Sequence, residues 1–121
     1  MSNDLWRGCF IAESLIDPTI LNNYQCFKIR ITKTIYELDN EGNRGRWHMY
    51  WIKAPQEDFD LFTANMKYNW YGHFWKGNDI IAIFQQKKFK LKLNDKTTWQ
   101  AAIEFGLSQG IVAEQLDFLT I

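Results

Sequence analysis

The chain of 121 residues is 46% hydrophobic and 23% charged, and its formal net charge is zero. This length and composition predict one globular domain, residues 1–121, with a core of its own. Zero net charge argues against nucleic-acid binding driven by the field of the whole molecule. No apolar run approaches the roughly 18 residues that a membrane span needs, and no signal-peptide pattern is present, so we expect a cytoplasmic protein without a membrane partner.

The first strand is expected at residues 5–15, where apolar residues occupy both faces, as in an inner strand of a sheet. A short helix is expected after it. Asp17 is a good N-cap residue, and Pro18 at the first helical position loses no donor that the helix needs.

A hairpin is expected next, with strands at residues 26–38 and 46–53 joined by a polar, glycine-bearing loop at residues 39–45. Along the first of these strands the apolar alternation slips by one position, which predicts a β-bulge near residues 31–34. The second strand should present two alternating sets of side chains: Trp47, Met49 and Trp51 on one face, and His48, Tyr50 and Ile52 on the other.

Two further helices are expected. One begins at Pro55, and Phe59, Phe62 and Met66 form its apolar stripe. The other covers residues 96–108 after an Asp95 cap, with Gly110 suited to a left-handed C-cap. Its buried stripe is expected to comprise Trp99, Ala102, Ile103 and Leu107. The apolar tail at residues 111–121 should dock onto the domain.

Residues 68–93 predict three consecutive antiparallel strands. The Gly77-Asn78 turn pairs His73 with Ala82, and an even loop at residues 85–88 pairs Phe84 with Phe89. One face then carries Tyr71, His73, Trp75, Ile80, Ala82, Phe84, Phe89, Leu91 and Leu93, which the third helix should cover. The other face carries Trp70, Gly72, Phe74, Ile81 and Ile83 beside Lys88, Lys90 and Lys92, and it is the expected partner surface.

The element order predicts the fold class. Strand, helix, strand, strand, helix and strand are followed by two strands and a helix, which is the ferredoxin-like βαββαβ order with an added β-hairpin and C-terminal helix. The expected fold is therefore α+β, with an antiparallel sheet.

His73 is a candidate ligand-pocket residue, with Tyr71, Trp75 and Ala82 around it. This histidine lies between Tyr71 and Trp75 and opposite the small Ala82, which leaves room for a ligand or a water. The alternative is a core histidine bonded to a neighbour. His48 and Tyr50 are further pocket candidates, although two histidines without a carboxylate at fixed spacing predict no metal site.

No catalytic residue or cofactor is predicted. The chain has no nucleophile elbow and no glycine-rich phosphate loop. Cys9 and Cys26 have no metal-ligand spacing and are interpreted as packed thiols.

A basic and aromatic patch is the other candidate surface. Its members are Lys28, Arg30, Lys88, Lys90 and Lys92, with Trp70 and Phe74 as the rings. A βαββαβ sheet that presents rings and lysines is how RNA-recognition modules stack bases. RNA-recognition signatures are missing, however, and a solvated, protective edge strand explains the same lysines.

Several short motifs together resemble a family of small uncharacterised (hypothetical) prokaryotic proteins. They are Leu5-Trp6-x-Gly8, Trp47-His48-x-Tyr50, Trp70-Tyr71-x-His73-Phe74-Trp75, Thr98-Trp99-x-x-Ala102-Ile103-Glu104 and Glu114-Gln115-Leu116-Asp117-Phe118. The resemblance implies a stand-alone cytoplasmic domain of this length, and it implies no activity, cofactor or catalytic residue.

Three function classes stay open. The leading one is a non-enzymatic binding or regulatory domain, including a homodimer that buries one sheet face, by analogy with other ferredoxin-like folds. The second is a small-molecule binder or enzyme that uses His73. The third is single-stranded RNA binding through Lys88, Lys90, Lys92 and the aromatic residues of the sheet.

Overall fold

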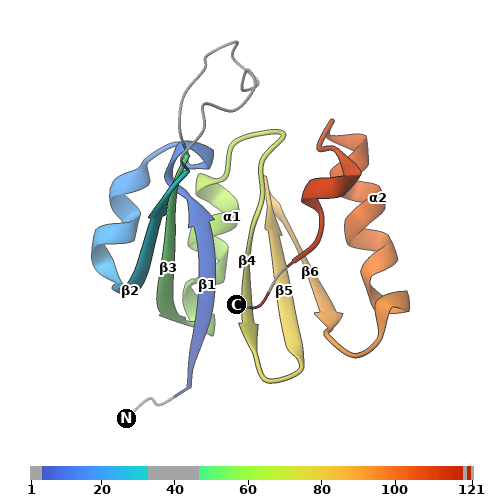
Figure 1. Ribbon diagram of the computed structural model, residues 1–121, viewed down its shortest axis with the longest axis horizontal. Helices are drawn as coiled ribbons and strands as arrows, with labels where there is room; N and C mark the ends of the chain where they lie inside the picture. The colour runs from blue at the N-terminus through green and yellow to red at the C-terminus, as the bar shows by residue number, and fades with distance from the viewer. Residues whose placement is uncertain (1–3, 33–46, 119, 121) are drawn as a thin grey trace.

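The computed structural model describes residues 4–32, 47–118 and 120. Within these ranges the chain forms an antiparallel sheet of six strands in the order β2-β3-β1-β4-β5-β6 (Figure 1). The strands are β1 (Leu5–Ile11), β2 (Gln25–Ile31), β3 (His48–Pro55), β4 (Gly72–Lys76), β5 (Asp79–Phe84) and β6 (Lys87–Lys92). The expected loop at residues 39–45 lies outside the described residues, and so does half of the expected bulge region, residues 33–34.

The helices of the described ranges are short. The α-helices are α1 (Phe59–Asn65) and α2 (Gln100–Ser108). The 3₁₀ helices are η1 (Ala12–Ser14), η2 (Pro18–Asn23), η3 (Gln56–Asp58), η4 (Lys96–Trp99) and η5 (Ala113–Gln115). The predicted α+β class with an antiparallel sheet is confirmed. No helix in the described part of the chain is long and apolar enough to cross a membrane.

Local capping explains where the helices begin and end. The carboxylate of Asp17 accepts from the Thr19 backbone N–H at 3.1 Å, and Asp95 accepts from Thr97 in the same way. Gly110 has φ +83°, the left-handed conformation that ends a helix at low cost. These three predictions are confirmed, although both Asp caps begin 3₁₀ rather than α turns.

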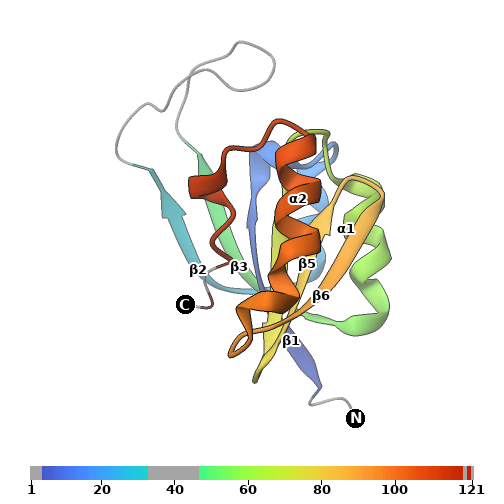
Figure 2. The same cartoon turned by 90° about the vertical axis from the view of Figure 1, so that its right-hand side faces the viewer.

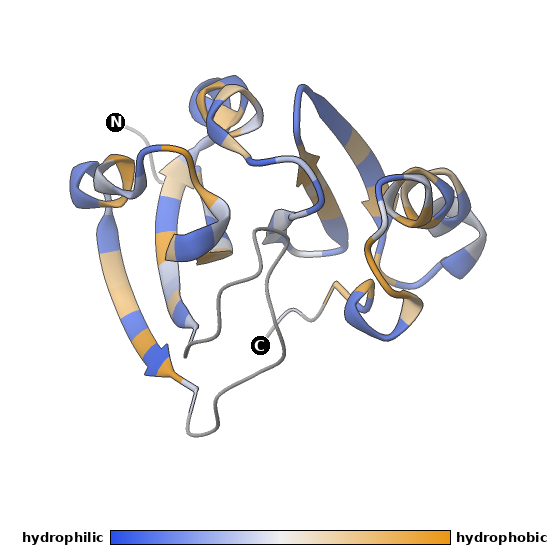
Figure 3. Ribbon diagram, turned by 90° about the horizontal axis from the view of Figure 1, so that it is seen from above, coloured by the Kyte–Doolittle hydropathy of each residue, from blue (hydrophilic) through white to orange (hydrophobic). Residues whose placement is uncertain are grey.

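The helices cover the two faces of the sheet unequally. In the end-on view, α1 lies on one side of the sheet and α2 on the other (Figure 3). Helices η2 and α1 pack on the first face, over β1, β3 and β4. Helix α2 and the C-terminal segment, residues 111–118, pack on the second face, over β4, β5 and β6 (Figure 2). Neither α-helix of the described residues lies over the second face of β2, β3 and β1, and we call this the open face.

The first core lies between the sheet and helices η2 and α1. It consists of Trp6, Phe10, Leu15, Leu21, Ile52, Ala54, Phe59, Phe62, Met66, Phe74, Ile81 and Ile83. Phe74 is fully buried and stacks on Phe59 with the ring centroids 4.2 Å apart. The predicted partner surface around Phe74 is therefore wrong, because α1 covers this side of β4 and β5.

The second core lies between the sheet, α2 and the C-terminal segment. It consists of Trp51, Trp75, Ile80, Ala82, Phe84, Leu91, Trp99, Ala102, Ile111, Leu116 and Phe118. The predicted cover of this face by the third helix and the docking of the tail are confirmed through residue 118. Leu107 was expected to be buried but is 47% exposed, because Ala102 and Gly106 form the buried side of α2.

The register of the central strands follows the prediction at the first turn and differs at the second. His73 pairs with Ala82, as expected. Gln86 adopts φ +59°, so a turn of only two residues joins β5 to β6 and pairs Phe84 with Lys87 instead of Phe89. The predicted register is wrong by two residues, and a shift of two leaves every side chain on its expected face.

Candidate functional site

A cavity of about 380 Å³ opens on the second face of the sheet, beside the C-terminal segment. Strands β1 and β4 pair over only three residue pairs, which end at Cys9 and His73. Ile11 on one strand, and residues 69–71 with Gly72 at the start of the other, line the space beyond that point. The cavity thus forms where these two central strands stop pairing. Its volume lies in the usual range for small-molecule sites, about 300–1,000 Å³.

Several aromatic rings line the cavity. Strand β3 contributes Trp51 and Met49, Trp47 comes directly before this strand, and the segment before β4 contributes Trp70 and Tyr71. Trp47 and Trp70 meet edge to face with their centroids 5.5 Å apart. Because successive residues of a strand point to opposite faces, residues 47, 49 and 51 all reach the same side.

The edge strand β2 supplies a basic wall. A bulge between Cys26 and Lys28 resets the alternation so that Lys28 and Arg30 pair with Trp51 and Met49 and share their face. The Lys28 ammonium lies 4.5 Å from the centroid of a Trp51 ring. Figure 3 shows the alternation of hydrophobic and hydrophilic residues along this strand.

The C-terminal segment supplies an acidic wall. Glu114, Gln115 and Asp117 line the cavity, and the neighbouring Leu116 and Phe118 are buried in the second core. The Tyr71 hydroxyl donates a hydrogen bond to the backbone carbonyl of Gln115. The segment is therefore held by buried apolar anchors that alternate with polar residues facing the cavity.

His73 lines the bottom of the cavity and is 7% exposed. Its ring stacks on Trp75 at 5.1 Å and meets Phe118 edge to face at 6.2 Å. Tyr71 and His73 thus take the positions expected of pocket residues. Trp75 and Ala82 belong to the second core beneath them and do not line the cavity.

His48 and Tyr50 lie on the other face of β3, so their predicted place in the same pocket is wrong. The Nδ1 atom of His48 is 2.6 Å from the Glu13 carboxylate, and Tyr50 packs against the first core. The two histidines of the chain therefore do not share a cavity. Among the described residues, no group of three or more His, Cys, Asp or Glu side chains could hold a metal ion.

The structure separates the predicted basic patch into two parts. Lys88, Lys90 and Lys92 lie on β6, at the opposite edge of the sheet from Lys28 and Arg30. They also alternate with Phe89 and Leu91 of the second-core side, so they face the α1 side, where Lys88 reaches Asp60 of α1 at 2.8 Å. A single surface that combines all five cations does not form.

Burial controls the ionisation of two groups in the cavity. It raises the pKa of the Cys9 thiol to about 12, with Lys28 lowering this pKa and Asp117 raising it. Burial also raises the pKa of the Tyr71 hydroxyl, and the Asp117 carboxylate raises it further. Both side chains are therefore neutral at pH 7, and neither is an activated nucleophile or base.

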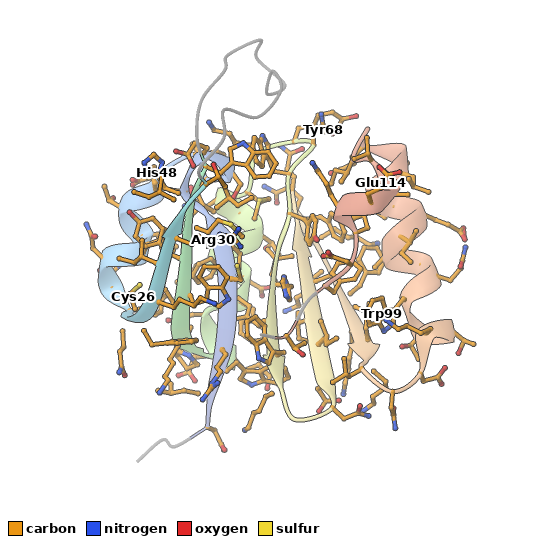
Figure 4. The ribbon with its side chains drawn as sticks, viewed as in Figure 1. Cys26, Arg30, His48, Tyr68, Trp99 and Glu114 are labelled. Carbon is orange, nitrogen blue, oxygen red and sulfur yellow. The ribbon has the colours of Figure 1, made fainter. Side chains whose placement is uncertain are left out.

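Cys9 should react far more slowly than Cys26 with iodoacetamide at pH 8. The thiolate is the reactive form, and a pKa of about 12 leaves only about one Cys9 thiol in 10⁴ ionised at that pH. Cys26 is exposed on the edge strand (Figure 4). Peptide mass spectrometry over time should show Cys26 modified first, and Cys26→Ser should leave native protein almost unlabelled. Equal labelling rates at the two cysteines would contradict the burial of Cys9.

Sequence reasoning missed part of the lining. Trp47, Met49 and Trp51 were assigned to one face of their strand, but the alternation does not say which face surrounds a cavity. Glu114 and Asp117 had no sequence signal beyond the apolar alternation of the tail. Lys28 and Arg30 were assigned to a partner patch, and the structure places them in one cavity with Tyr71 and His73.

No protein-family model matches the chain, and no curated protein or solved structure is found to be similar to it. The function is therefore inferred from the geometry and the chemistry of the cavity.

Proposed function

We propose that the chain is a small-molecule-binding domain that holds a flat aromatic or heteroaromatic ligand in the cavity of the open face. The observation that carries this proposal is the combination of volume and lining, about 380 Å³ bordered by Trp47, Trp51, Trp70 and Tyr71. Tryptophan and tyrosine rings stack on flat ligands and lose little conformational freedom when they do so.

Binding has more support than catalysis. The cavity holds one thiol and one phenol, and burial keeps both protonated at neutral pH. General acid–base or nucleophilic chemistry needs groups with pKa values near the working pH. The thiol and the phenol are therefore better suited to orienting a ligand than to transferring its protons.

For the fold, we propose that the first four strands form a ferredoxin-like unit. Its support is the order β2-β3-β1-β4, in which β1 and β2 flank β3, while β3 and β4 flank β1. The β5–β6 hairpin and α2 would then be the added elements. In this arrangement η2 and α1 cover one face of the unit, and the cavity occupies the other.

RNA binding through Lys88, Lys90 and Lys92 has less support, because these lysines lie away from the rings of the open face. Homodimer formation and a cytoplasmic location stay predictions.

Filling the cavity should abolish ligand binding. Ile11→Trp places a bulky ring among the lining residues, whereas Ile29→Trp makes the same change at a site 59% exposed on the other side of β2. A flat ligand at ten times its Kd should stabilise the wild type by about 1.4 kcal/mol and raise Tm by several degrees.

A thermal-shift screen of bicyclic aromatic compounds provides the measurement, with NMR titration to locate each hit. The Ile29→Trp control should respond as the wild type does, and Ile11→Trp should lose the response. The absence of any hit, or equal responses of the two variants, would contradict the proposed site.

A further inference from the structure

We propose that the ligand of this cavity is zwitterionic, with an acidic group directed to Lys28 and Arg30 and a basic group directed to Glu114 and Asp117. This inference rests on the proposed function and names the class of ligand. It concerns a flat ring system that carries a carboxylate or phosphate at one end and an amine at the other.

The two signs of charge come from separate elements. Lys28 and Arg30 belong to the edge strand β2, and Glu114 and Asp117 belong to the C-terminal segment. Figure 4 shows Arg30 beside β2 and Glu114 beyond β4, with the central strands between them. Because all four residues line one cavity, a ligand that lies across β1 and β4 would meet positive charge at one end and negative charge at the other.

These charges do not neutralise one another directly. Arg30, Glu114 and Asp117 form no side-chain hydrogen bond or ion pair among the described residues, and the Lys28 ammonium lies over Trp51. Elsewhere in the domain charges do pair, as in Lys76 with Asp4 at 2.9 Å. The cavity therefore keeps its opposite charges apart and available to a ligand.

The charged residues of the two walls shift the pKa values of other groups in the cavity. Cys9 lines the same cavity, and the pKa of its thiol is lowered by the charge of Lys28 and raised by that of Asp117. The Asp117 carboxylate also raises the pKa of the Tyr71 hydroxyl. The aromatic lining lowers the local polarity, so charges act on a bound molecule more strongly here than on the open surface.

Electrostatic complementarity then selects among ring compounds. A purely anionic ligand would gain from Lys28 and Arg30 but would bring its ring close to two carboxylates. A purely cationic ligand would gain from the two carboxylates but would bring its ring close to Lys28 and Arg30. A ligand with both groups at opposite ends satisfies both walls, since specificity comes from unfavourable as well as favourable charge contacts.

Three matched naphthalene probes test this inference by NMR titration of the full chain at pH 7. They are 6-(aminomethyl)-2-naphthoate, which is zwitterionic, 6-methyl-2-naphthoate, which is anionic, and (6-methylnaphthalen-2-yl)methylamine, which is cationic. The zwitterion should bind roughly tenfold more tightly than either relative, as expected for one additional charge-assisted hydrogen bond.

Neutral substitutions identify whether the basic wall or the acidic wall contacts each charged group of the ligand. Arg30→Gln should weaken the zwitterion and the anion several-fold and leave the cation unchanged. Asp117→Asn should weaken the zwitterion and the cation and leave the anion unchanged. Lys90→Gln and Glu57→Gln make equivalent charge changes outside the cavity lining and should alter none of the three affinities.

The outcomes separate this inference from the proposed function. If the three probes bind with equal affinity, or if Arg30→Gln and Asp117→Asn affect all of them alike, the zwitterion proposal is overturned while the aromatic cavity stands. If none of the probes and no other flat compound binds, both proposals fall together. The inference is supported if Arg30→Gln weakens only the zwitterion and the anion, and Asp117→Asn weakens only the zwitterion and the cation.

Discussion

Replacing Phe74 with alanine is expected to lower the free energy of unfolding by about 3–5 kcal/mol, as for other fully buried aromatic residues. The ring is 0% exposed, stacks on Phe59 at 4.2 Å, and contacts Phe10 and Phe62 at centroid distances of 5.0 and 5.1 Å. Its neighbour across the sheet is Gly8, where a Cβ atom would lie 2.6 Å from the Phe74 ring. The space that alanine leaves is closed by rigid strands, which cannot move together to fill it.

Urea unfolding of both proteins, followed by circular dichroism, measures the difference. Phe27→Ala is the matched control, because Phe27 is 39% exposed on the edge strand and its loss should cost less than about 1 kcal/mol. A loss of less than 1 kcal/mol for Phe74→Ala would indicate that this face of β4 is a surface after all, as the sequence alone suggested.

Phe118→Ala is expected to cost about 3 kcal/mol of unfolding free energy and to loosen the acidic wall of the cavity. Phe118 is 1% exposed and meets Tyr71, Trp99 and His73 edge to face at 5.2, 5.4 and 6.2 Å. It adopts φ +44°, so the backbone turns as its ring enters the second core. Without this anchor, Asp117 should lose its fixed position beside Tyr71.

Unfolding curves and NMR spectra of the variant check both parts of this prediction. Val112→Ala is the control in the same segment, since Val112 is 51% exposed and should change stability by less than about 1 kcal/mol. The NMR chemical shifts of Tyr71 and Cys9 should change in Phe118→Ala and should be unchanged in Val112→Ala. Wild-type stability in Phe118→Ala would show that the segment does not dock through this ring.

Local sequence patterns were sufficient for the element order and for the central hairpin. Gly77, with φ +58°, makes a two-residue turn, and this turn pairs His73 with Ala82 as predicted. Asp17, Asp95 and Gly110 marked the beginnings and ends of helices because capping depends on residues close together in the chain.

Alternation along a strand also separated the side chains into two sets correctly. It assigned Phe74 to one face and His73 to the other, and it kept them apart even where the register was wrong by two residues. Side-chain period in a strand is a local property, so a shift of two residues preserves it.

Only the tertiary structure decided which set is buried and which surrounds a site. Helix α1 crosses over the Phe74 side, and the chain then places the helix after β6 on the other side. The strand order β2-β3-β1-β4 brings Lys28 and Arg30 to the cavity that contains Tyr71 and His73, and it sends Lys88, Lys90 and Lys92 to the far edge. Glu114 and Asp117 reach the cavity because Leu116 and Phe118 dock between them. Contacts between residues so far apart in the chain depend on how strands cross and pack, and no local pattern encodes that choice.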